Sequence, residues 1–238
     1  MDEAILELKE LISKSKRIVF FGGAGVSTES GIPDFRSKDG LYNQKYDYPP
    51  EEILSHTFFM RNTEEFYKFY RDKLNSLKYE PNVTHFRLAE LEKEGKLTAV
   101  VTQNIDGLHQ KAGSKRVDEL HGSVMRNYCM KCGKFHSAAA VFESTGVPRC
   151  ECGGLIKPDV VLYEEPLDQK VVHSATRAIA NADLLIIGGT SLTVYPASSY
   201  IQYFHGGKMV LINKNSTQFD GFADIVINRG LGEVFSQI

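Results

Sequence analysis

The feature that most constrains the fold is a series of short apolar runs, most of them followed by glycine or small polar residues. The runs are strand-sized and cover residues 17–21, 97–102, 184–187, 209–212 and 225–227. Continuous apolar runs of this length are typical of strands buried on both faces of a parallel sheet. Helical patterns lie between them, so the sequence predicts an α/β fold with helices on both faces of that sheet.

The helices are predicted from apolar residues that recur every three to four positions. We expect helices over residues 2–15, 24–30, 51–77 and 81–94. The aromatic side chains of 51–77 are expected to pack in a core and not to form a ligand pocket. Residues 31–50 are rich in Pro, Gly, Asp and Tyr and are predicted to be a long loop, which in a compact domain is usually functional or disordered.

The first apolar run leads into a glycine-rich turn, Gly23-Ala24-Gly25-Val26-Ser27-Thr28. Between a strand and a helix, G-x-G-x-x-G binds a dinucleotide, because glycines allow a tight turn and a close approach to the pyrophosphate. Thr28 replaces the third glycine, and no acidic residue closes a second strand about 20 residues later, so the motif alone is weak. A tight turn without a ligand would look the same.

Three other predicted strands also lead into small or amide residues. These segments are Gln103-Asn104-Ile105-Asp106-Gly107, Gly188-Gly189-Thr190-Ser191 and Asn213. In open α/β sheets, ligands bind beyond the carboxyl ends of the strands. The four strand ends are therefore predicted to line one binding site.

The four cysteines form two close pairs, Cys129 with Cys132 and Cys150 with Cys152. The spacing fits a zinc ion held by four thiolates, and a glycine follows each pair, as suits a thiolate turn. Four thiolates leave no open coordination position, so the zinc is expected to be structural. Two disulfides are the alternative, which is disfavoured because cytosolic thiols stay reduced.

Charge and hydropathy argue against two other classes of protein. The formal net charge is −2, without the clustered basic excess of a nucleic-acid binder. No apolar run approaches the roughly 18 residues of a membrane span. The acidic, amphipathic start MDEAILELKELI differs from a secretory signal. We therefore expect a cytoplasmic protein with no membrane partner and no direct nucleic-acid binding.

Taken together and in order, these motifs resemble those of the sirtuins. The similarity covers almost the whole chain and runs through GAGVST (23–28), GIPDFR (31–36), TQNIDGLH (102–109), ELHG (119–122), both cysteine pairs, KPDVV (157–161) and GGTSLTVYPA (188–197). The resemblance implies an NAD-dependent protein-lysine deacetylase that acts on acetylated proteins or peptides. Its products would be nicotinamide, O-acetyl-ADP-ribose and the deacetylated protein.

The same resemblance implies one catalytic domain over 1–238 with three parts. A Rossmann-like large domain would cover about 1–35, 76–121 and 160–238, a helical insert about 36–75, and a zinc module about 122–159. The zinc module would hold one structural zinc. NAD would be the co-substrate.

The resemblance also assigns site residues. The NAD pocket would be formed by Gly23, Ala24, Gly25, Thr28, Phe35, Arg36, Gln103, Asn104, Ile105, Asp106, His121, Gly189, Thr190, Ser191 and Asn213. Of these, His121 would be the general base, assisted by Asn104 and Asp106. Val161, Leu162 and Tyr163 would pair with the substrate backbone as an added strand.

Two departures bear on the choice of substrate. Glu164 stands where many relatives have glycine, beside the expected peptide groove. Relatives that remove acidic acyl groups carry tyrosine and arginine three residues apart in the insert. Here Tyr67 is followed at that spacing by Tyr70, with Arg71 one residue later, which favours acetyl over succinyl.

Two alternative functions stay open at this point. An NAD-dependent protein ADP-ribosyltransferase could use the same pocket. A non-catalytic NAD or zinc sensor would be expected to lack the base or a residue of the nicotinamide pocket, whereas His121, Asn104 and Asp106 are all present.

Overall fold

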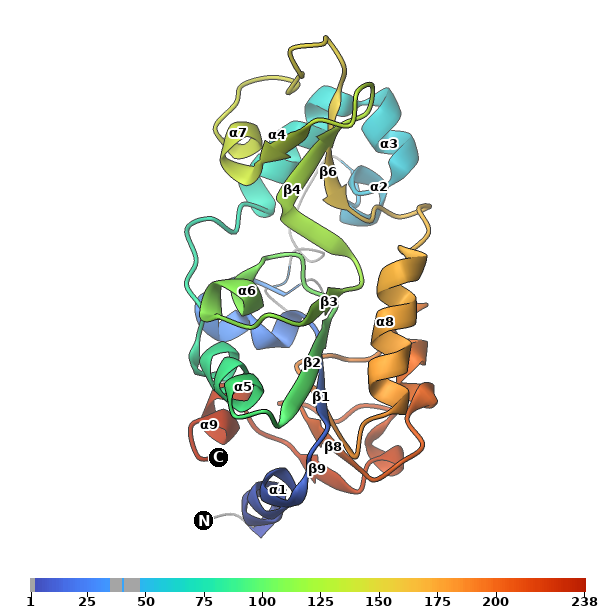
Figure 1. Ribbon diagram of the computed structural model, residues 1–238. Coiled ribbons are helices and arrows are strands. Elements are labelled where there is room, and N and C mark those ends of the chain that lie inside the picture. Colours follow the sequence, from blue (N-terminus) through green and yellow to red (C-terminus); the bar gives the residue numbers. More distant parts are fainter. Residues whose placement is uncertain (1–2, 35–39, 41–47) are drawn as a thin grey trace.

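Two sheets organise the molecule, a computed structural model that describes residues 3–34, 40 and 48–238 (Figure 1). The larger sheet has six parallel strands in the order β3-β2-β1-β7-β8-β9. Its strands are β1 (Ile18–Gly22), β2 (Leu97–Thr102), β3 (Val117–Glu119), β7 (Leu184–Gly188), β8 (Lys208–Ile212) and β9 (Ile225–Ile227). The five strands predicted from the sequence are confirmed, and β3 is a further edge strand.

The order of the strands reverses at β1. Strands β2 and β3 lie on one side of β1, and β7, β8 and β9 lie on the other. β1 pairs in register with β7, with Gly22 opposite Gly188. In a doubly wound sheet the ligand crevice opens where the order reverses, so the carboxyl ends of β1 and β7 mark the expected site.

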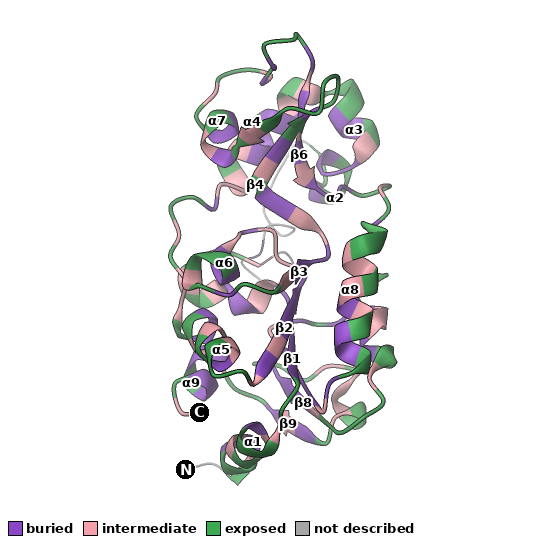
Figure 2. Ribbon diagram, viewed as in Figure 1, coloured by how far each residue is buried: buried purple, intermediate pink, exposed green. Residues whose placement is uncertain are grey.

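Helices cover both faces of this sheet, and each face has its own apolar core (Figures 1 and 2). One face is covered by α1 (Glu3–Lys14), α5 (Val83–Lys93) and α9 (Leu231–Phe235). The other face is covered by α8 (Gln169–Ala180) and the 3-10 segment η4 (Ala197–Tyr203). Phe20 and Phe21 of β1 belong to opposite cores, because successive side chains of a strand point to opposite faces.

The second sheet belongs to the part of the chain that carries the cysteines. Its antiparallel strands, in the order β5-β4-β6, are β4 (Gly122–Cys129), β5 (Phe135–Ser137) and β6 (Ile156–Val160). Helix α7 (Ala138–Phe142) packs against β4. Figure 1 shows this sheet at the opposite end of the molecule from α1.

The predicted helical segment 51–77 forms three short helices, α2 (Pro50–Ile53), α3 (His56–Arg61) and α4 (Thr63–Lys73). The break before α3 falls at Ser55, whose hydroxyl accepts the Phe58 N–H and caps the new helix. The aromatic residues pack as predicted, in a core shared with the cysteine-bearing sheet; Tyr70, for example, stacks on Phe142 with ring centroids 5.1 Å apart.

The predicted helix over 24–30 is wrong. The chain forms two 3-10 turns, η1 (Ala24–Val26) and η2 (Thr28–Ser30), separated by Ser27. The second turn ends at Gly31, whose φ of 91° stops it. Helix α6 (Leu108–Ala112) follows β2, and η5 (Asp220–Phe222) precedes β9.

Most of the predicted long loop, with Phe35 and Arg36, lies outside the described residues. Among the residues that are described, no helix combines the length and the apolar character needed to cross a membrane.

Candidate active site

Two glycine loops interlock at the carboxyl ends of β1 and β7. The Gly25 N–H donates to the carbonyl oxygen of Gly189 at 2.8 Å, and the Gly23 N–H donates to Gly188 at 3.3 Å. A Cβ atom at Gly25 would lie 2.7 Å from the Cα of Gly189, which itself has a φ of 62°. The close packing of the two loops is therefore enough to explain glycine at position 25, whether or not a phosphate also approaches there.

The first glycine loop also contacts the loop after β2. The hydroxyl of Ser27, which is buried, donates to the carboxylate of Asp106 at 2.6 Å and accepts from the amide of Asn104 at 3.1 Å. Thr28 closes the turn, since its hydroxyl donates to the Gly25 carbonyl at 3.0 Å. Ser27 was not assigned from the sequence, although its place inside the glycine motif and its hydroxyl could have suggested a contact.

The loop after β2 is held in one conformation by its own groups. The Gln103 N–H donates to the Gly22 carbonyl at 2.9 Å, and the Asn104 N–H donates to the Thr102 hydroxyl at 3.0 Å. The other carboxylate oxygen of Asp106 accepts the Leu108 N–H at 2.9 Å. Burial raises the pKa of Asp106, although the Ser27 and Leu108 hydrogen bonds act in the opposite direction.

One buried donor of this loop has no partner. The side-chain nitrogen of Gln103 is inaccessible to solvent and donates to no group among the described residues. A buried donor that is left unpaired costs free energy, and a bound polar ligand can satisfy it. With the glycine loops beside it, this donor fits a ligand such as NAD that carries many oxygen and nitrogen acceptors.

His121 follows β3 and faces the same loop. Its Nδ1 atom lies 3.0 Å from the carbonyl oxygen of Gln103. Burial lowers the pKa of His121, and the hydrogen bond to Gln103 opposes this to a smaller extent. A carbonyl oxygen can only accept, so Nδ1 carries the proton and Nε2 of the neutral ring keeps its lone pair.

On the other side of the crevice, Thr190 and Asn213 form a closed pair. The Thr190 N–H donates to the Asn213 side-chain oxygen at 3.0 Å, and the Asn213 side-chain nitrogen donates to the Thr190 carbonyl at 3.0 Å. Asn213 therefore fixes the loop after β7. The neighbouring Ser191 is exposed, with its hydroxyl 2.9 Å from that of Thr193.

The segment Val161–Tyr163 connects the base to the helical insert. The Val161 N–H donates to the His121 carbonyl at 3.0 Å, and the Tyr163 N–H donates to Leu54 at 2.9 Å. The Leu162 N–H donates to the carboxylate of Glu165 at 3.0 Å. All three N–H groups thus have partners within the chain, and the carbonyl oxygens of Leu162 and Tyr163 accept the N–H groups of Glu165 and His56, each at 3.0 Å.

Glu164 adopts a left-handed backbone conformation with a φ of 75°. Its carboxylate accepts from the Thr57 N–H at 2.9 Å and from the Thr57 hydroxyl at 2.7 Å, in the first turn of α3. These contacts compensate for the strain that a non-glycine residue has there.

The tyrosines and the arginine of α4 are used for packing. The hydroxyl of Tyr67 donates to the carbonyl of Ile156. Arg71 donates to the carbonyls of Val141 at 3.1 Å and Gly146 at 2.6 Å. The polar atoms of Tyr67 and Arg71 are therefore hydrogen-bonded to the cysteine-bearing part of the fold, and the two side chains do not form a carboxylate-binding pair.

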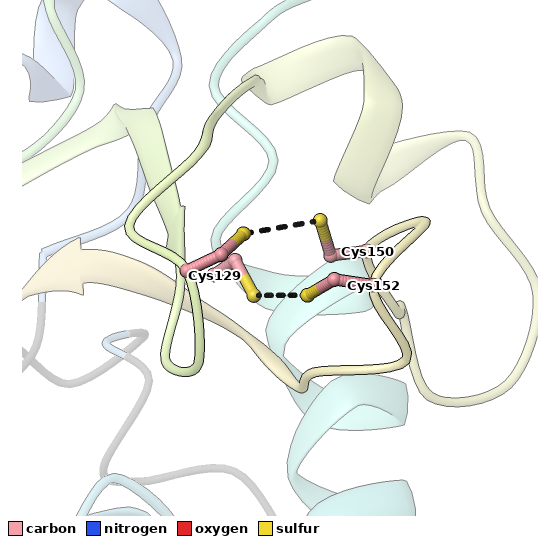
Figure 3. Close-up of side chains that lie close together, drawn as sticks. Cys129, Cys150 and Cys152 are labelled. Carbon is pink, nitrogen blue, oxygen red and sulfur yellow. Dashed lines mark hydrogen bonds between the residues drawn. The ribbon is translucent and has the colours of Figure 1, made fainter.

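The four cysteines come together at one end of the second sheet (Figure 3). All four sulfur atoms lie within 4.8 Å of one another. The Cys129–Cys152 and Cys132–Cys150 sulfur distances are 3.4 and 3.7 Å. Tetrahedral zinc with Zn–S bonds of about 2.3 Å places sulfur atoms about 3.8 Å apart, so the cluster fits the predicted metal.

A protein-family model described as "Sir2 family" matches residues 23–196 of the chain. An NAD-dependent protein deacetylase of Clostridium perfringens is 59% identical, and the alignment covers 100% of this chain and 99% of that protein. Another from Clostridium acetobutylicum is 56% identical, with 99% and 98% covered.

Solved structures agree with the sequence comparisons. A Sir2 variant in complex with a deacetylated p53 peptide and 3′-O-acetyl ADP ribose superposes with a TM-score of 0.90. It is 39% identical in sequence, and the match covers 98% of this chain and 96% of that one.

Proposed function

The chain belongs to the Sir2 family and is an NAD-dependent protein deacetylase, and we propose that His121 is the general base of this reaction. The observation that carries the proposal is the contact of the His121 Nδ1 atom with the Gln103 carbonyl at 3.0 Å. This contact leaves Nε2 as the acceptor. Burial lowers the pKa of His121, which favours the neutral ring at pH 7.

The reaction moves the acetyl group from a lysine side chain to the ribose of NAD, nicotinamide leaves, and one water is consumed. NAD supplies the electrophilic ribose carbon and the hydroxyl that finally carries the acetyl group. The role we assign to His121 is to accept a proton from a ribose hydroxyl. A general base of this kind contributes roughly 10²–10⁴-fold to a rate.

We assign the nicotinamide end of the pocket to Gln103, Asn104, Ile105 and Asp106. The support is that Ser27 and the Leu108 N–H hold both oxygens of the Asp106 carboxylate in place. Gln103 adds a buried donor that lacks a partner among the described residues.

The glycine loops and the loops after β7 and β8 are assigned to the rest of NAD. The residues are Gly23, Ala24, Gly25, Thr28, Gly189, Thr190, Ser191 and Asn213. The support for the loops after β1 and β7 is their position where the strand order reverses. The support for Asn213 is its pair of hydrogen bonds with Thr190. Phe35 and Arg36, which lie outside the described residues, are assigned to the same pocket on the resemblance alone.

Acetylated lysine in a protein or peptide is the proposed substrate, and Val161 to Tyr163 border its place. The preference for acetyl is supported by Tyr67 and Arg71, whose polar atoms are used inside the fold. No direct contact with nucleic acid is part of the proposal.

The cysteine cluster is assigned to one structural zinc. Thiolates of this kind need a reducing compartment, so the proposed location is the cytoplasm. The division into a large domain, a helical insert and a zinc module is retained as a proposal; its support is that the insert and the module share a separate core.

Incubation with acetylated peptide and NAD labelled in the ADP-ribosyl part tests the proposed function. We expect label in O-acetyl-ADP-ribose, one equivalent for each nicotinamide released. Label that stays on protein would support ADP-ribosyl transfer instead. Binding of NAD without nicotinamide release would support a sensor.

A further inference from the structure

The turn after β1, residues 24–30, depends on its neighbours for its shape. It consists of the 3-10 segments η1 and η2, of three residues each, and 3-10 geometry gives poorer hydrogen bonds than an α-helix does. The loops after β7 and β2 support the turn at Gly25 and Ser27. A third support comes from Asn82, a residue that the sequence did not single out.

Asn82, which directly precedes α5, donates to both segments of the turn. Its side-chain nitrogen lies 2.8 Å from the carbonyl oxygen of Val26, the last residue of η1. The same nitrogen lies 3.0 Å from the hydroxyl oxygen of Ser30, the last residue of η2. A primary amide carries two hydrogens, so one side chain can serve both acceptors. Val26 is 1% exposed, so water has little access to its carbonyl and cannot easily replace Asn82.

The position of Asn82 is itself fixed by α5. Its side-chain oxygen accepts the Thr84 N–H at 3.0 Å, and its backbone N–H donates to Nδ1 of His85 at 3.2 Å. These contacts cap the helix in the manner of a capping box. Helix α5 packs on the large sheet through the buried Leu88 and Leu91. Asn82 therefore joins the turn to a helix that the core holds in place.

Thr28, which is assigned to NAD, lies in the chain between the two acceptors of Asn82. The turn also reaches α9, where the Gly232 N–H donates to the carboxylate of Glu29 at 3.2 Å. Glu29 is exposed, whereas Asn82 is half-buried and its contacts are shorter. Asn82 is therefore the stronger of these two links between the turn and the helices.

We propose that Asn82 is a positioning residue of the NAD pocket, whose amide holds the turn 24–30 in the conformation that receives the cofactor. The inference rests on the proposed function, because it takes Ala24, Gly25 and Thr28 to be contacts of NAD. When a binding segment spends only part of its time in the competent conformation, the apparent dissociation constant of the ligand rises in proportion. Loss of the Asn82 amide should therefore weaken NAD binding although Asn82 is not among the residues assigned to NAD.

The test is the dissociation constant of NAD for the zinc-loaded protein, measured by calorimetry. N82A removes both the donor and the cap, and we expect NAD affinity to fall by about tenfold. N82S keeps an acceptor for the cap, but its hydroxyl has a single hydrogen, so we expect a loss of about threefold. Asp168 caps α8, on the other face of the sheet, by accepting the Lys170 N–H at 2.7 Å. D168A therefore controls for the loss of a helix cap and should bind NAD like the wild type.

Two further measurements separate positioning from a general loss of stability. For N82A the KM of NAD should rise, whereas kcat and the KM of the acetylated peptide should stay within about twofold of the wild type. In the absence of NAD, the amide hydrogens of residues 26–31 should exchange faster in N82A than in D168A, because local opening of the turn becomes easier.

S30A tests the contact from its other side. It removes one of the two acceptors of Asn82, and we expect NAD affinity to fall by about twofold to threefold. In N82A/S30A the two losses should not multiply, because both variants remove the same hydrogen bond.

The proposal would be overturned if folded N82A binds NAD as tightly as the wild type, or if D168A is impaired as much as N82A. Zinc content and the midpoint of urea unfolding show whether each variant is folded. If N82A does not fold, N82S and S30A decide the matter in the same way against D168A. A wild-type protein that does not bind NAD would contradict the proposed function itself, whereas amide exchange in the turn would still report on Asn82.

Discussion

The hydroxyl of Ser27 lies 2.6 Å from the carboxylate of Asp106 and joins the glycine loop after β1 to the loop after β2. The two residues are 1% and 9% exposed, so the hydrogen bond is shielded from water. Since Asn104 donates to the same hydroxyl, Ser27 fixes two residues of the proposed nicotinamide pocket together.

Replacement of Ser27 by alanine should weaken NAD binding by about tenfold, because the buried Asp106 oxygen and Asn104 nitrogen each lose a partner. Loss of the hydroxyl also removes one influence that lowers the pKa of Asp106. S27A should therefore lose more affinity at pH 6 than at pH 8. S27T, which keeps a hydroxyl, is the matched control, and equal affinities of S27A and wild type would contradict the role given to Ser27.

Alanine at Gly25 should disrupt the crevice without unfolding the protein. Its Cβ would lie 2.7 Å from the Cα of Gly189, so one of the two interlocked loops has to move. We expect NAD affinity to fall by at least about tenfold, in line with the cost of crowding a packed contact. Gly221 has nothing within 4 Å of its Cβ position, so G221A controls for the general effect of glycine replacement.

The interlock of Gly25 and Gly189 could not be predicted from the sequence. The strands could be predicted, because runs such as Leu184–Ile187 are buried on both faces and leave a continuous apolar pattern. The pairing that places position 25 against position 189 depends on the order of the strands, which local pattern does not encode. From the sequence, the glycines could be explained only by a tight turn or by a ligand.

Two elements of the structure, α8 and β3, were missed because their local sequence patterns are weak. Helix α8 was not predicted, since its buried face is largely alanine, with Ala175 and Ala178 beside Ile179. Strand β3 has three residues, too few for a pattern. At the site, the resemblance supplied His121, but its protonated nitrogen depends on the position of the Gln103 carbonyl, which only the fold provides.

Two buried histidines should make the protein sensitive to acid. His85 and His109 lie with ring centroids 4.7 Å apart, and burial lowers the pKa of His85 from 6.5 to about 4. Burial, with the charge of His85, also lowers the pKa of His109. Because the folded state disfavours the protonated rings, the stability they contribute is complete above pH 6.5 and is lost as the pH falls towards 4.

The measurement is urea unfolding of the zinc-loaded protein between pH 7.5 and pH 5. For His85 alone the full loss is on the order of 3 kcal/mol, reached only below pH 4. H85Q should show a shallower dependence of unfolding free energy on pH. His173 is exposed, so H173Q should keep the wild-type slope. A flat profile for the wild type would contradict this account.

Removal of zinc should unfold the cysteine-bearing sheet β5-β4-β6 and stop catalysis only indirectly. Two of the four cysteines, Cys129 and Cys150, lie in the same core as the helical insert and are 2% and 5% exposed. Cys132 and Cys152 are exposed. A chelator should therefore release one zinc ion per protein chain and lower the urea midpoint of unfolding. C129S should lower the same midpoint and contain less than one zinc per chain. Activity should return when zinc is restored to the chelated wild type; a metal-free protein that is folded and active would contradict a structural role.

The most direct test of the central claim is a paired measurement on H121A, of turnover and of NAD affinity. If Nε2 of His121 accepts the ribose proton, turnover of an acetylated peptide should fall by at least about 10²-fold. The dissociation constant of NAD should stay within about threefold of the wild type, because the Gln103 carbonyl positions the His121 ring and the proposed contact of this ring with NAD is a single ribose hydroxyl. Full deacetylation by H121A would contradict the assignment of the base, and with it the proposed chemistry of the crevice.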